Sequence, residues 1–171
     1  MTGDKSSTET QVVGVGVHPV TPHLVCAGAA DAIAFYKKAF GATEMMVLPG
    51  PDGRIMHACL SINGSSVMLV DEFPGMGNFS PKALKGTPVT IHLMVDDVDK
   101  VAETAISAGA MLVMPVADMF WGDRYGVLED PFGHRWSIAT HKRRLSESEL
   151  REAARAAMTG RNCHKEQLDE H

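Results

Sequence analysis

The sequence predicts an α+β fold of two βαβββ modules, each a four-stranded sheet with one helix. The first observation is that the same order of strand-like and helix-like segments occurs in residues 19–72 and again in 87–141. The second is that a shift of 69 residues superimposes Thr21 on Thr90, His23 on His92 and Gly64 on Gly133. We expect the two sheets to lie side by side with the helices packed outside, forming a cup suited to a small ligand.

The first module begins with a strand at residues 21–27. Apolar residues then recur with a helical period over residues 29–40, and Gly41 is a typical helix stop. Asn63-Gly64 separates two apolar strands and predicts a hairpin, because both central residues of that turn need positive φ. The three strands of this part are 43–49, 55–62 and 65–72.

The second module follows a loop rich in Gly and Pro at residues 73–88. Residues 97–108 predict a helix that stops at Gly109. The predicted strands are 87–95, 110–116, 123–130 and 134–141.

The two ends of the chain lie outside this repeat. Residues 1–17 have no hydrophobic period and predict a flexible arm. Residues 142–171 predict a C-terminal helix and a disordered tail. Ser146 and Glu149 form a capping box for a helix over about 147–158 that ends near Gly160 and docks weakly on the body or on a partner subunit, and we expect the last eleven residues to be disordered.

Composition excludes several classes of function. The chain has 171 residues, of which 44% are apolar, and a net charge of −5, which argues against a nucleic-acid surface. No apolar run approaches the ~18 residues that span a membrane, and residues 1–20 lack the order of an export signal. Three cysteines without CxxC spacing, Cys26, Cys59 and Cys163, indicate free thiols. We therefore expect a cytoplasmic protein with neither a membrane nor a nucleic-acid partner.

Several segments together resemble the vicinal oxygen chelate superfamily of glyoxalases, bleomycin resistance proteins and dioxygenases. They are AIAFYKKAFGA, VDDVDKVAETAISAGA and DPFGHRWSIATH. MHACLSINGSSVMLVDEFP and PVADMFWGDRYGVLEDPFGHRWSIATH are similar to its PhnB-like branch. The resemblance covers residues 19–141 and implies the paired βαβββ fold and, as in many relatives, a homodimer.

The resemblance also implies four metal-ligand positions, one each on the first, fourth, fifth and eighth strands. In this chain they are Thr21, Met68, Thr90 and Ser137. Hydroxyl and thioether groups bind a divalent metal poorly, so we expect no cofactor and no metal at the usual position. The alternative is a divalent metal in a displaced site built from His23, Glu72, His92 and His141.

Five residues are candidates for binding a ligand. His23 and His92 share the strand face of Thr21 and Thr90, and would either bind the ligand or tie the two sheets together. Trp121, Arg124 and Tyr125 lie in a loop that could cap the cup. Arg124 would fork onto a carboxylate or phosphate of the ligand, or pin its loop. The carboxylates considered for pinning are those of Asp123, Glu129 and Asp130.

Four further residues or groups have a structural interpretation. His57 is expected at an interface or in a hydrogen bond, and His134, after a turn glycine, in solvent. Cys26 has the parity of Leu24 on the helix side of its strand and is expected to be a buried, inert thiol. The methionine-rich runs are expected in the strand core or along an adaptable pocket.

Three functions stay open. The first is a glyoxalase-like lyase or isomerase that depends on a metal. The second is a small-molecule binding protein that sequesters a drug or metabolite. The third is a metal-independent enzyme with His23 or His92 as general base. The absent metal ligands favour the second.

Overall fold

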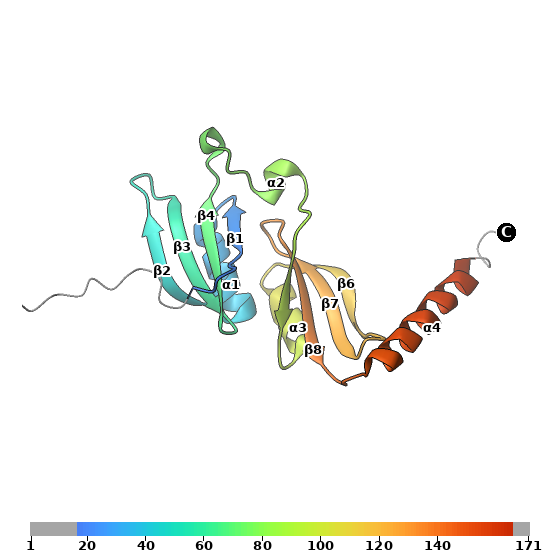
Figure 1. Cartoon of the computed structure of the whole chain (residues 1–171). Helices are drawn as coiled ribbons and strands as arrows, with labels where there is room; N and C mark the ends of the chain where they lie inside the picture. The colour runs from blue at the N-terminus through green and yellow to red at the C-terminus, as the bar shows by residue number, and fades with distance from the viewer. Residues whose placement is uncertain (1–16, 166–171) are drawn as a thin grey trace, which may run out of the picture.

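The computed structural model describes residues 17–165 and contains two four-stranded sheets (Figure 1). The strand orders are β1-β4-β3-β2 and β5-β8-β7-β6. β1 pairs with β4 in parallel, as β5 does with β8, and all other neighbouring strands are antiparallel. The strands are β1 (His23–Cys26), β2 (Thr43–Pro49), β3 (Ile55–Ile62), β4 (Ser65–Asp71), β5 (Thr90–Met94), β6 (Met111–Asp118), β7 (Asp123–Glu129) and β8 (Arg135–His141). The predicted pair of βαβββ modules is confirmed.

Each module has one main helix, α1 (Ala29–Phe40) or α3 (Val98–Ser107). The sequence signals for their ends are confirmed: Gly41 ends α1 with φ of 65°, and the Asp97 side chain accepts from the Lys100 N–H at the start of α3. Asn63 and Gly64 adopt φ of 47° and 80° in the β3–β4 hairpin, as predicted.

The Gly- and Pro-rich loop before β5 contains two short helical turns that the sequence did not predict. They are η1 (Pro74–Met76) and α2 (Pro81–Leu84). Proline at the first position of each turn is compatible with a helix start, because the missing N–H is unpaired there in any helix. Figure 1 shows α2 above the space between the two sheets.

α4 (Glu147–Lys165) confirms the capping box but extends beyond the expected end. The Ser146 Oγ accepts from the Glu149 N–H at 3.4 Å, and a Glu149 carboxylate oxygen accepts from the Ser146 N–H at 2.7 Å. The expectation that the helix ends near Gly160 is wrong, since one glycine inside a helix costs only about 1 kcal/mol. Figure 1 shows α4 directed away from the sheets. The expectation of disorder is also wrong for residues 161–165, which belong to α4, whereas residues 1–16 of the predicted arm and 166–171 of the predicted tail lie outside the described residues.

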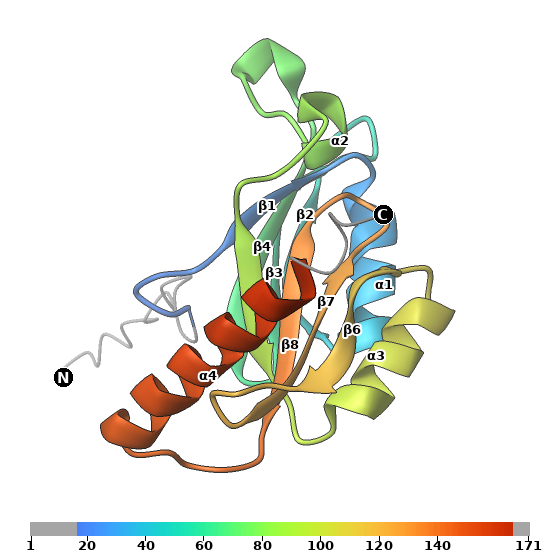
Figure 2. The same ribbon diagram turned by 90° about the vertical axis from the view of Figure 1, so that its right-hand side faces the viewer.

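α1 and α3 lie on one side of the molecule, side by side, and α1 also packs on the second module (Figure 2). The Tyr36 hydroxyl donates to Asp130 Oδ2 at 2.6 Å, and the rings of Tyr36 and Phe40 lie 5.3 and 4.8 Å from Trp136, centroid to centroid. Apolar residues of both modules therefore form one core. On the opposite side, each sheet has a helix-free face, which carries His23 and Met68 in the first sheet and His92 and Ser137 in the second.

Candidate functional site

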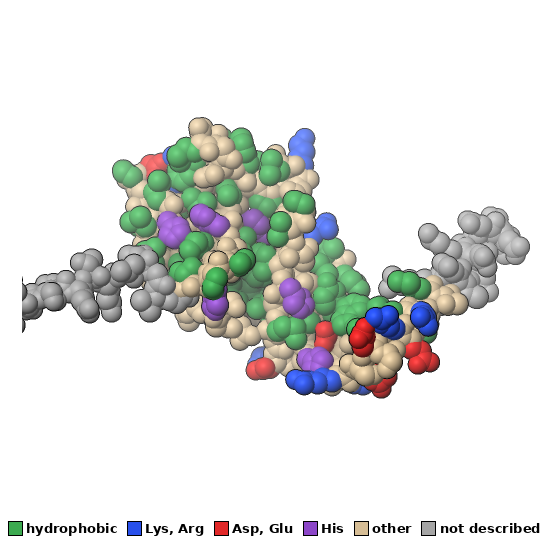
Figure 3. All heavy atoms as spheres, viewed as in Figure 1, with side chains coloured by type: hydrophobic (Ala, Val, Ile, Leu, Met, Phe, Trp, Pro, Cys, Tyr) green, Lys and Arg blue, Asp and Glu red, His purple; other side chains and the backbone are tan. Residues whose placement is uncertain are grey.

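A hollow in the described part of the chain lies between β1 and β5, which are edge strands of different sheets; we call this space the seam. A cavity of about 660 Å³ occupies it. Its lining is mostly apolar and contains three histidines but no Asp, Glu, Lys or Arg. The lining comes from residues 20–25 and 86–92 together with Phe79, Pro81, Leu84 and His134. In Figure 3, histidine and hydrophobic side chains gather on the side of the molecule in view, on both sides of the seam.

His23 and His92, equivalent in the sequence repeat, both line this cavity. The His23 ring contacts the His57 ring edge-on, with centroids 5.6 Å apart, so His57 shares the helix-free face. Burial, and then the neighbouring His57, hold the pKa of His23 below its usual value. The His23 imidazole is therefore neutral near pH 7 and can accept a hydrogen bond.

His92 is held by its own module. Its Nδ1 lies 2.8 Å from Ser137 Oγ on the neighbouring strand, and its ring stacks on Tyr125 with centroids 6.2 Å apart. Trp121 contacts Tyr125 in turn at 5.5 Å between centroids. Three of the five predicted ligand-binding residues thus form a continuous aromatic group on the helix-free face of the second sheet.

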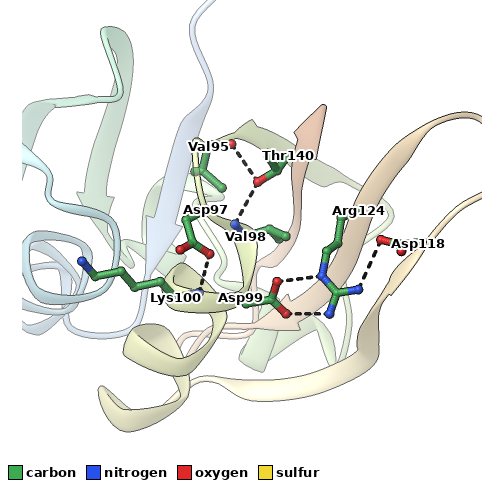
Figure 4. A network of polar contacts seen from close by, with 8 residues as sticks. All are labelled: Val95, Asp97, Val98, Asp99, Lys100, Asp118, Arg124 and Thr140. Atoms are coloured by element: carbon green, nitrogen blue, oxygen red, sulfur yellow. Dashed lines mark hydrogen bonds and ion pairs between the residues drawn. The ribbon is translucent and has the colours of Figure 1, made fainter. Parts of the chain in front are cut away.

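Arg124 lies apart from this group. Neighbouring strand residues alternate between sheet faces, so Arg124 faces α3, where its Nε and Nη2 donate to both carboxylate oxygens of Asp99 at 2.6 and 2.7 Å (Figure 4). Its Nη1 donates to Asp118 Oδ1 at 3.2 Å. Two roles were expected for Arg124, and the structure shows the ion pair that fixes its loop. Its partners are Asp99 and Asp118 instead of the expected Asp123, Glu129 or Asp130. Neither Trp121, Arg124 nor Tyr125 lines the seam cavity.

His134 is buried, and the expectation that it is solvated is wrong. Only 8% of its surface is exposed, because its ring packs across the seam against the first module. Its Nε2 donates to the Val25 carbonyl at 3.1 Å. Burial lowers its pKa, although the nearby Asp130 opposes the shift. No local signal could reveal this, since the partner lies more than 100 residues away.

Cys26, as expected, is a buried thiol. It is fully inaccessible, and burial raises its pKa well above the usual range, so it is held as the unreactive thiol.

The four usual metal positions do not fit a metal. Thr21 Oγ1 donates to the His18 carbonyl at 2.9 Å, and Ser137 Oγ contacts His92. Met68 offers only a thioether, which is a soft donor. Three hydroxyls, from Thr21, Thr90 and Ser137, and one thioether are a poor donor set for Zn, Ni or Fe.

The displaced set of four is not assembled either. Glu72 Oε1 accepts from the Ser80 N–H at 2.6 Å, and His141 Nδ1 lies 2.8 Å from Asp123 Oδ1. Among residues 17–165 no group of three or more His, Cys, Asp or Glu side chains could hold a metal ion.

No helix in the same part of the chain is long and apolar enough to cross a membrane.

Known proteins share both the sequence and the fold. The uncharacterised protein Mb0911c of Mycobacterium bovis is 49% identical over 145 residues, which cover 82% of this chain and 95% of that protein. The uncharacterised protein At5g48480 of Arabidopsis thaliana is 32% identical over 154 residues, which cover 78% of this chain and 90% of that protein.

Solved structures agree with this. The X-ray structure of the Arabidopsis At5g48480 product matches with a TM-score of 0.59 at 30% identity, covering 71% of this chain and 98% of that one. TioX from Micromonospora sp. ML1 matches with a TM-score of 0.58 at 27% identity, covering 71% and 97%. The PhnB protein from Bacillus cereus shares the fold with a TM-score of 0.56 at 19% identity, covering 72% and 99%.

The family comparison agrees with the modules and their repeat. The model of the Glyoxalase/Bleomycin resistance protein/Dioxygenase superfamily matches residues 16–138, which cover the first βαβββ module and the second as far as the middle of β8. The chain therefore belongs to the glyoxalase/bleomycin resistance protein/dioxygenase superfamily.

Proposed function

We propose that the protein binds a small, uncharged and largely apolar molecule, a metabolite or a drug, in the seam cavity without changing it chemically. The main support for this proposal is the cavity. Its volume of about 660 Å³ lies in the ordinary range for ligand pockets, and its apolar side chains surround a few polar groups. A charged ligand would have no partner there, because no ionised carboxylate, ammonium or guanidinium lines it. The cytoplasmic location and the homodimer stay predictions from the sequence.

The histidines give the cavity its polar anchors. His23 and His92 reach it from opposite edges, so a ligand between them can bond to both modules. In a cavity that is otherwise apolar, a few placed polar groups fix the orientation of the ligand and its specificity.

The test uses Nile red, an uncharged apolar dye, with fluorescence titration and calorimetry. We expect His23→Ala and His92→Ala each to weaken binding by about 1–3 kcal/mol, the usual cost of an unsatisfied buried polar partner. His141→Ala is the control, since His141 is exposed and paired with Asp123 away from the seam. If the two histidines only tie the modules together, thermal melts will change more than affinity. If both variants bind like the wild type, the binding site lies elsewhere.

One observation favours a second candidate, a metal-independent lyase or isomerase of glyoxalase type. The lowered pKa of His23 leaves its imidazole neutral at pH 7, as a general base requires. Mass spectrometry of a molecule that co-purifies with the protein, before and after long incubation, separates the two. An unchanged mass and fragmentation pattern supports binding alone, and a converted product supports the enzyme.

A further inference from the structure

The seam is bordered by two strand edges that pair with no further strand of the described part of the chain. β1 pairs only with β4, and β5 only with β8. The Met68 and Glu72 N–H groups donate to the carbonyls of Pro22 and Cys26, so residues 22, 24 and 26 face β4. His23 and Val25 therefore direct their backbone groups into the seam.

The same reasoning applies to β5. The Val95 N–H donates to the Ala139 carbonyl, so the odd-numbered residues of this strand face β8. Thr90, His92 and Met94 direct their backbone groups into the seam, opposite those of β1.

Two side chains close the seam at its ends. At one end, His134 Nε2 donates to the Val25 carbonyl at 3.1 Å. At the other, Asn63 Nδ2 donates to the Met94 carbonyl at 2.6 Å. Within residues 17–165, no backbone hydrogen bond joins β1 to β5. The edges are thus connected at both ends but do not pair, and the backbone groups of His23, Thr90 and His92 between these ends have no hydrogen-bond partner among the residues that the structure describes.

The seam cavity follows both edges. Its lining includes every residue from Val20 to Val25 and every residue from Gly86 to His92. An unpaired strand edge is a template for another extended backbone, and main-chain bonds to such an edge provide affinity in many peptide-binding proteins. A purely apolar ligand would leave these N–H and C=O groups without partners.

We infer that the seam binds an extended, peptide-like backbone of about three residues, which adds a strand between β1 and β5. This inference names the ligand class of the proposed function and rests on it. Three residues of extended chain span roughly 10 Å, which matches the runs from His23 to Val25 and from Thr90 to His92. The uncharged lining requires blocked ends and uncharged side chains.

The probe is the capped tripeptide acetyl-Val-Ser-Val-amide, compared with the analogue that is N-methylated at its backbone amides. N-methylation keeps the side chains and removes the donors that an added strand uses. We expect calorimetry to show at least about tenfold weaker binding of the analogue, because several hydrogen bonds are lost together. Equal binding of both peptides, or binding of neither, overturns the inference.

A matched pair of protein variants tests the edge itself. His92→Ala and His92→Pro both remove the imidazole, but only proline removes the N–H that faces the seam, and that N–H takes no part in the sheet. We expect the tripeptide to bind at least about tenfold more weakly to His92→Pro than to His92→Ala. Thermal melts verify folding, and if His92→Pro does not fold, the two peptides alone decide.

Nile red separates this inference from the proposed function. If the dye binds and His23→Ala weakens its binding, but the two peptides bind equally, only the peptide-like ligand class is overturned. If neither the dye nor the peptide binds at the seam, both the proposed function and the peptide inference are overturned.

Discussion

The buried carboxylate of Asp130 accepts hydrogen bonds from several parts of the molecule. Only 5% of it is exposed, and it accepts from Tyr36 Oη at 2.6 Å and from Trp136 Nε1 at 2.9 Å. The N–H groups of Phe132 and His134 donate to its other oxygen. A carboxylate can be buried here because all of these donors surround it. Asp130 therefore connects α1, the β7–β8 turn and β8 in one network.

We expect Tyr36→Phe to lower the free energy of unfolding by about 1.5–3 kcal/mol, since it removes a hydrogen bond to a charged, buried acceptor. Asp130→Asn keeps the shape but leaves the tyrosine a weaker acceptor. Urea denaturation of the two single variants and the double variant forms a cycle, and the changes should not add. Additive losses would show that the Tyr36–Asp130 contact does not couple the modules.

His134 and His23 should make stability depend on pH. Both have a lowered pKa in the folded protein, mainly through burial, so the unfolded chain binds more protons once the pH falls toward 6.5. Their contribution is fully present above that pH and is lost as the pH falls through their folded pKa values. We expect the free energy of unfolding to fall between pH 7.5 and 5.5.

His134→Gln keeps a donor near the Val25 carbonyl but does not titrate. Its stability should therefore change less with pH than that of the wild type over the same interval, as measured by urea denaturation at each pH. An identical slope would mean that His134 is protonated equally in both states.

At the scale of the element, the turn between β6 and β7 depends on one glycine. Gly122 has φ of 99°, and a Cβ there would lie 2.2 Å from the Arg143 carbonyl oxygen. The Lys142 and Arg143 N–H groups both donate to the Gly122 carbonyl, so the chain after β8 is fixed to this turn. Both the positive φ, which only glycine adopts readily, and the close approach of Arg143 exclude a side chain at this position.

We expect Gly122→Ala to lower the free energy of unfolding by roughly 1–3 kcal/mol, because it adds a clash to an unfavourable backbone conformation. Gly75→Ala is the control, since nothing lies within 4 Å of its added Cβ and its φ is not in the left-handed region. Thermal melts of both variants provide the measurement, and equal melting temperatures would contradict the steric argument.

The elements also show what the sequence can and cannot predict. Local signals were sufficient for the strands and for α1 and α3, because periodicity, Gly41 and Asn63-Gly64 act over a few residues. The turns η1 and α2 were missed, since their Gly and Pro content is also typical of a plain loop. The burial of His134 and the partners of Arg124 could not be predicted, because both residues contact segments that are distant in the sequence.

At the scale of the whole molecule, the two modules share one core and should unfold together. Side chains of α1 pack against Trp136 and Phe132 of the second module, so neither module buries its apolar surface alone. We expect a single calorimetric transition whose calorimetric and van't Hoff enthalpies agree. A ratio well above one, or two separate peaks, would show that the modules unfold independently.

The contact between Tyr36 and Asp130 has a consequence for the history of the repeat. One repeat after Tyr36 stands Ala105, and the position of the first module that corresponds to Asp130 is Ser61. The contact therefore has no mirror image, and the two halves are no longer interchangeable parts. A duplicated ancestor could assemble from identical halves, whereas here the first half lacks the carboxylate that its own tyrosine needs. If the two halves were made as separate chains, each would be expected to select the other over a copy of itself.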